Sequence, residues 1–81
     1  MSVQNEMRRV KKTNLEYAAK RLRREIEDLA RIICLNLDCS LHHPEDLPIG
    51  EADAQFDQLK AKWGELVVAL AEISRIDEEL R

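Results

Sequence analysis

The chain has 81 residues, enough for one small domain with a modest core, and such domains usually gain stability from a staple, a metal or a partner. Two glycines, two prolines, 4% aromatic and 36% charged residues favour helices and argue against a strand-rich barrel or a disordered tail. The formal net charge is −3, and the longest apolar run, residues 66–71, is too short to span a bilayer, so we expect a soluble, cytoplasmic protein.

The first predicted helix covers about residues 4–40. From Leu15 onward its apolar residues recur at alternating steps of four and three, which places them in one stripe along an α-helix. Spacing of this kind is typical of a coiled-coil seam. The stripe consists of Leu15, Ala19, Leu22, Ile26, Leu29 and Ile33.

The connection is predicted at about residues 41–50, where both prolines and Gly50 fall. Pro44 disfavours the helical conformation at His43, so the first helix should end nearby. This is the one break in the helical pattern. Residues 1–81 are therefore predicted to form a single helical-hairpin domain.

The second predicted helix covers about residues 51–81. Its apolar residues recur at steps of three, four or seven, which again places them in a single stripe. The stripe consists of Ala52, Phe56, Leu59, Trp63, Leu66, Leu70, Ile73 and Leu80.

Two long helices joined by a short connection are expected to lie antiparallel, as an all-α hairpin in which residues whose numbers sum to about 90 face one another. This register predicts Trp63 in the seam, packed near Ile26 and Leu29. The tryptophan would then be the main anchor between the two helices.

One hairpin is not expected to complete the structure, because two helices cover only one side of each other. Dimerisation into a four-helix bundle would cover the remaining apolar residues, and twofold dimers are the commonest oligomers. Gly64, Val68 and Ala71 form a row of small residues that would let another helix approach closely. The predicted oligomer interface consists of Ile32, Leu35, Gly64, Val67, Val68 and Ala71.

Charge is unevenly distributed along the chain, since residues 1–24 contain eight basic residues against Glu6 and Glu16. The basic residues are Arg8, Arg9, Lys11, Lys12, Lys20, Arg21, Arg23 and Arg24. An antiparallel hairpin would place this segment beside acidic residues near the chain's end, so we expect pairing between the helices. Those acids are Glu72, Asp77, Glu78 and Glu79. The alternative is that the basic residues follow the phosphate backbone of a nucleic acid.

Potential metal ligands gather near the connection, where Cys39, His42 and His43 follow Cys34. Thiolates and imidazoles suit zinc, but a structural zinc site needs four ligands and the chain has no second Cys/His pair. The two cysteines are expected to be reduced thiols. A metal-binding protein is one form of the third functional hypothesis. Its other form is an all-α metal-dependent hydrolase, in which Glu25 and Asp28 share a helix face near Glu65 and hold the metal.

The sequence favours a non-enzymatic helical-hairpin module that acts by protein–protein association. It would be a homodimer or a small adaptor or chaperone subunit that binds another helical protein. A nucleic-acid-associated regulator is the alternative. No cofactor and no membrane partner are expected.

Overall fold

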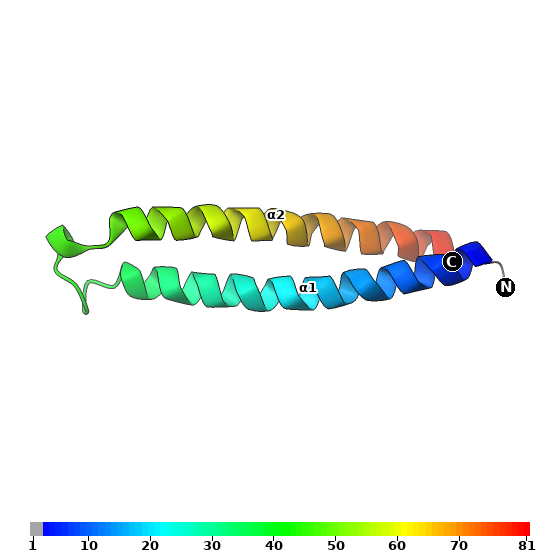
Figure 1. The fold of residues 1–81 in the computed structure, drawn as a ribbon, viewed down its shortest axis with the longest axis horizontal. Helices are drawn as coiled ribbons and strands as arrows, with labels where there is room; N and C mark the ends of the chain where they lie inside the picture. The colour runs from blue at the N-terminus through cyan, green and yellow to red at the C-terminus, as the bar shows by residue number, and fades with distance from the viewer. Residues whose placement is uncertain (1–2) are drawn as a thin grey trace.

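The computed structural model describes residues 3–81, which form a hairpin of two long helices (Figure 1). Helix α1 spans Val3–Asn36, a single 3-10 turn η1 spans Pro44–Asp46, and helix α2 spans Ile49–Leu80. The start of α1 and the end of α2 lie at one end of the hairpin, and the connection lies at the other (Figure 1). The predicted antiparallel all-α hairpin is confirmed; the first two residues of the predicted domain lie outside the described residues.

Helix α1 ends at Asn36, earlier than the predicted residue 40, because Asp38 supplies competing hydrogen bonds. The Asp38 carboxylate accepts from the backbone N–H of Ser40 at 2.8 Å and from its hydroxyl at 2.7 Å. These bonds lower the pKa of Asp38 and offer the backbone a turn in place of another helical turn.

Helix α2 begins at Ile49, two residues before the predicted start. Pro48 stands at its N-cap, and the N–H of Ala52 donates to the Pro48 carbonyl at 3.0 Å. A proline at this point costs no helical hydrogen bond, because the first N–H groups of a helix have no partner within it. Gly50 consequently belongs to the first turn of α2 rather than to the connection.

The seam on α1 follows the predicted stripe, with Ala19 and Leu22 buried and its other members half-buried. On α2 the seam follows strictly alternating steps of three and four, and Ile76, 1% exposed, is its most buried member. The positions on this line are Ala52, Gln55, Leu59, Lys62, Leu66, Ala69, Ile73, Ile76 and Leu80.

The predicted place of Trp63 in the seam is wrong, because its side chain is 61% exposed. Phe56 and Leu70, from the same predicted stripe, also lie outside the seam and are exposed. The predicted stripe contains apolar residues only, whereas the seam of the structure also contains the polar residues Gln55 and Lys62.

Polar side chains in the seam are paired between the two helices. The Asn36 amide donates to the Gln55 side-chain oxygen at 2.7 Å, and the Lys62 ammonium donates to the Glu25 carboxylate, which lowers the pKa of Glu25. Within residues 3–81, no buried side-chain nitrogen or oxygen lacks a hydrogen-bond partner. Paired polar layers of this kind fix the register of a helix pair.

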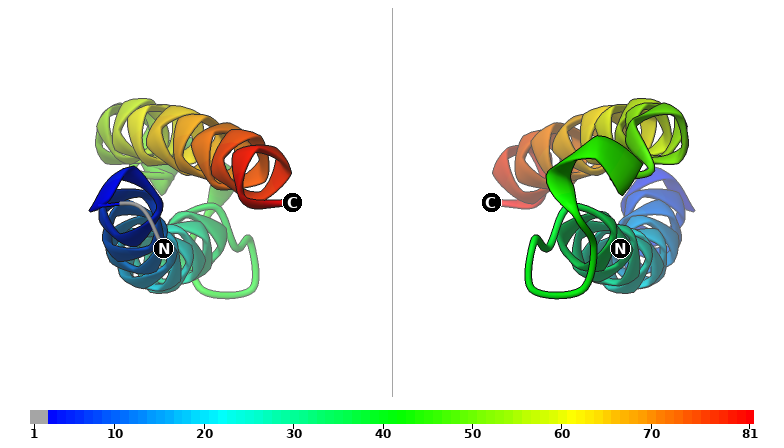
Figure 2. Two further views of the ribbon diagram at one scale, coloured as in Figure 1. Left: turned by 90° about the vertical axis from the view of Figure 1, so that its right-hand side faces the viewer. Right: turned by 90° about the vertical axis from the view of Figure 1, so that its left-hand side faces the viewer.

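The hairpin is long and thin, with extents of 63 × 15 × 14 Å and a radius of gyration of 18.3 Å, against about 12 Å for a globular chain of this length. End-on views show α1 crossing α2, and residues 3–81 form no further layer (Figure 2). The accessible surface is 6174 Å², whereas a globular protein of 9.4 kDa exposes about 5,000 Å². One hairpin therefore leaves an unusually large surface uncovered.

Candidate functional site

One side of α2 carries large apolar side chains at intervals of seven residues: Ile49, Phe56, Trp63 and Leu70. Seven residues are nearly two helical turns, so these side chains form one line, here called the apolar flank. Their side chains are 59%, 50%, 61% and 38% exposed, in chain order. Val67 lies one turn beyond Trp63 on the same side and is also exposed. The apolar flank lies roughly a quarter-turn around the helix from the seam.

The other side of the α2 seam has the opposite character. Its residues at seven-residue intervals are polar or acidic: Glu51, Gln58, Glu65, Glu72 and Glu79. Helix α2 is thus apolar on one side of the seam and acidic on the other. The apolar flank is a side of α2 that packing against α1 leaves uncovered.

The predicted interface residues are all at least partly exposed, but the structure divides them between different sides of the hairpin. Gly64 and Val68 line an open groove with Leu15, Ala18 and Leu22 of α1. A side-chain carbon added at Gly64 would have no neighbour within 4 Å, so packing within the hairpin does not require a glycine there. Ala71 is exposed on α2, and Val67 belongs to the side of the apolar flank. Ile32 and Leu35 are exposed near the end of α1.

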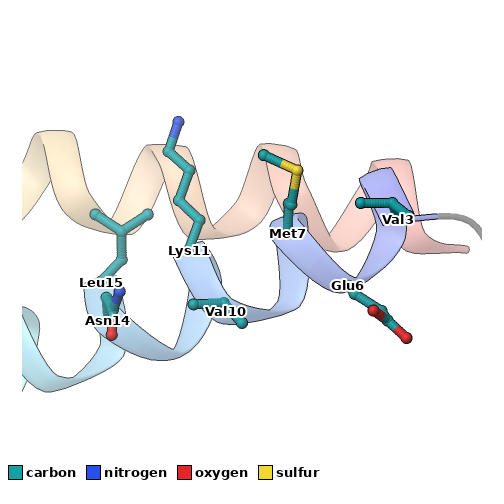
Figure 3. Close-up of a pocket in the computed structure, with 7 residues that line it drawn as sticks. All are labelled: Val3, Glu6, Met7, Val10, Lys11, Asn14 and Leu15. Carbon is teal, nitrogen blue, oxygen red and sulfur yellow. The ribbon is translucent and has the colours of Figure 1, made fainter.

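A second apolar surface lies near the start of α1, where Val3, Met7 and Val10 are exposed. They line an open groove of about 600 Å³ (Figure 3). Lys11 extends toward α2, where it pairs with Glu72, whereas Glu6 points the opposite way in the view of Figure 3. Every residue lining this groove comes from α1, so it is a helix surface rather than an enclosed substrate site.

The basic start of α1 pairs with the acidic end of α2, as predicted. Arg8 contacts Glu79 at 2.9 Å, Lys11 contacts Glu72 at 3.1 Å, and Lys12 pairs with Asp77. We call the six paired residues the ion-pair clasp. Arg75 extends the clasp, because its guanidinium pairs with both Glu72 and Glu79.

The clasp shifts the ionisation of its members. The neighbouring Arg75 and Lys11 lower the pKa of Glu72 to about 2, from an ordinary value of 4.5. The hydrogen bond to Asp77 raises the pKa of Lys12, and Glu72 raises that of Arg75. All these groups are accessible to water, so salt should weaken the clasp.

The basic residues predicted as a nucleic-acid surface differ in their surroundings. Arg8, Lys11 and Lys12 belong to the clasp, and Arg21 lies 3.6 Å from Glu25 on its own helix. The further candidates Lys20, Arg23 and Arg24 are exposed on the middle of α1, and Arg9 is exposed near its start. The positive charges of Arg8, Lys11, Lys12 and Arg21 are consequently already paired with carboxylates within the hairpin.

The candidate metal ligands Cys39, His42 and His43 lie in the connection between the helices. Cys34 and Cys39 are free and exposed, so no disulfide joins them. Among residues 3–81, no group of three or more histidine, cysteine or acidic side chains is arranged to hold a metal ion.

Over residues 3–81, neither helix has an apolar stretch long enough to cross a membrane. Comparisons with models of protein families, with curated proteins and with solved structures found no match.

Proposed function

We propose that this chain is a non-enzymatic association module, a helical hairpin that binds other helices through surfaces that its own seam leaves open. Its first partner is a second copy of the same chain, giving a four-helix bundle. The observation that carries this proposal is the apolar flank on α2, where four large side chains at seven-residue intervals face solvent. Contiguous exposed apolar surface marks sites of protein association.

The uncovered surface of the hairpin supports the same proposal. A standard interface removes about 800 Å² from each partner. The accessible surface of 6174 Å² exceeds that of a globular chain of this size by about 1,200 Å². An interface of standard size would therefore cover about two-thirds of this excess on each hairpin.

The ion pairs at the start of α1 argue against the use of this segment as a nucleic-acid surface. Binding to a nucleic acid gains its strength from lysine and arginine residues that neutralise phosphates and release counterions. Arg8, Lys11 and Lys12 already neutralise carboxylates of α2, so their use on phosphates would require opening the clasp. An adaptor or chaperone subunit that binds a different helical protein is the second form of the association hypothesis.

Thermal unfolding at several protein concentrations tests the proposal. If folding is coupled to self-association, the midpoint should rise with concentration. A midpoint that is constant up to tens of micromolar would contradict self-association. Retardation of DNA by the native protein, suppressed by moderate salt, would instead support the nucleic-acid alternative.

A further inference from the structure

We propose that the apolar flank of α2 is the contact surface between two copies of this chain, with the two α2 helices antiparallel and the twofold axis passing between Phe56 and Trp63. This inference rests on the proposed association function and deepens it by naming the surface and the pairing.

The spacing of the apolar flank makes it complementary to itself. A twofold interface requires that when one residue contacts a second, the second contacts the first in return. With the axis midway between Phe56 and Trp63, Phe56 lies opposite the partner's Trp63, and Ile49 lies opposite the partner's Leu70. An axis through Trp63 would place Ile49 opposite the partner's Asp77, leaving an apolar side chain beside a carboxylate. The midpoint axis is therefore the one that pairs all four apolar residues.

One charged side chain lies near the centre of the flank. Lys60 lies between Phe56 and Trp63 in the sequence, and within one chain its ammonium is 3.2 Å from the Asp57 carboxylate. The midpoint axis would place Lys60 at the level of the partner's Lys60, and the Asp57 carboxylate beside each ammonium would offset this pairing of like charges. The Lys60 ammonium also lies over the Phe56 ring, 5.4 Å from its centre, as in a cation–π contact.

The apolar flank ends where the ion-pair clasp begins. The next position at the same seven-residue interval after Leu70 is Asp77, which pairs with Lys12 of its own chain. Residues 49–70 cover about 33 Å of helix at 1.5 Å per residue, which is the length over which the two α2 helices would overlap. The clasp lies beyond this overlap, and its charges are paired within each hairpin. At these positions α2 is thus apolar over residues 49–70, on the surface proposed for the second copy, and acidic at Asp77, which pairs with α1.

The experiment compares Trp63→Ala with the control Val68→Ala in sedimentation equilibrium of the full chain. Val68 is 69% exposed on α2 but lies outside the apolar flank. Trp63→Ala should weaken the dimer at least about tenfold, as expected for an aromatic anchor at the centre of an interface. Val68→Ala should change the dissociation constant less than about twofold. Circular dichroism checks that both variants remain helical.

A disulfide experiment tests the antiparallel orientation in a Cys34→Ser, Cys39→Ser background. Mixing Phe56→Cys with Trp63→Cys should give mixed disulfides faster than either variant forms disulfides with itself. Faster self-linking of each variant would show parallel pairing and overturn the proposal.

The outcomes distinguish an error in the proposed contact surface from an error in the proposed association function. A dimer weakened by Val68→Ala and unaffected by Trp63→Ala would place the interface on the row of small residues, overturning the surface but leaving the association function. A native chain that stays monomeric throughout would overturn both this surface and the proposed self-association.

Discussion

Replacing Ile76 with alanine tests the assignment of the seam. Ile76 is 1% exposed and lies on the stretch of α2 that passes the start of α1, between the clasp residues Glu72 and Glu79. Burial of this kind makes an isoleucine-to-alanine change cost about 2–5 kcal/mol. We expect the lower part of this range, about 2–3 kcal/mol, because a two-helix layer can relax into the space more easily than a thick core.

For a domain of this size, each kcal/mol lowers the melting temperature by about 4–8 °C, so Ile76→Ala should melt about 10–20 °C below the native protein. The measurement is thermal unfolding by circular dichroism at one fixed protein concentration. Val10→Ala is the matched control: Val10 is exposed on α1, and the loss of its methyl groups should change stability by less than about 0.5 kcal/mol. A loss below about 1 kcal/mol for Ile76→Ala would mean that the seam does not pass through this residue.

Three further predictions concern the clasp and the polar layers. Arg8→Glu with Lys12→Glu should lower the melting temperature at low salt, and adding Asp77→Lys with Glu79→Lys should restore part of it; no recovery in the combined variant would show that these pairs do not stabilise the hairpin. Because the pKa of Glu72 is lowered to about 2, its contribution is complete above its ordinary value of 4.5 and is lost as the pH falls toward 2. The melting temperature should fall as the pH is lowered over this range, and it should fall less for Glu72→Gln than for the native chain. Equal falls would show that the Glu72 carboxylate does not cause the pH dependence. Asn36→Ala should destabilise the hairpin more than Asn14→Ala, measured by urea unfolding, because it leaves Gln55 without its partner; equal effects would show that this hydrogen bond is dispensable.

The sequence predicted the hairpin because the α1 stripe and the proline-containing connection are strong local signals. It also predicted the clasp, since antiparallel helices and opposite charges at the two chain ends leave few other arrangements. The start of α2 was less predictable, because Pro48 can stand at a helix cap as readily as in a turn.

The prediction of which α2 residues face α1 is wrong for a physical reason. Large apolar residues recur at seven-residue intervals both in the seam, as at Leu59 and Leu66, and on the apolar flank, as at Phe56 and Trp63. Apolar spacing alone cannot decide which line faces α1. Strictly alternating steps of three and four, which pass through Gln55 and Lys62, separate the seam from the apolar flank.

The sequence contains more apolar residues than one seam can bury, and the remaining ones lie on the exposed surface of the hairpin. A single helix pair buries few side chains fully, and the described core consists of Ala19, Leu22, Ala52, Ala69 and Ile76. Three of these five are alanines, which contribute little apolar area. Four other large apolar residues of α2, Ile49, Phe56, Trp63 and Leu70, lie on its flank, where a second hairpin would cover them.

The most direct test of the central claim is the mass of the native chain by sedimentation equilibrium, from low to tens of micromolar. Self-association predicts that the measured mass rises from the chain mass of 9.4 kDa toward twice that value as the concentration increases. A mass that stays at 9.4 kDa at every concentration, for a chain that is fully helical by circular dichroism, would contradict it.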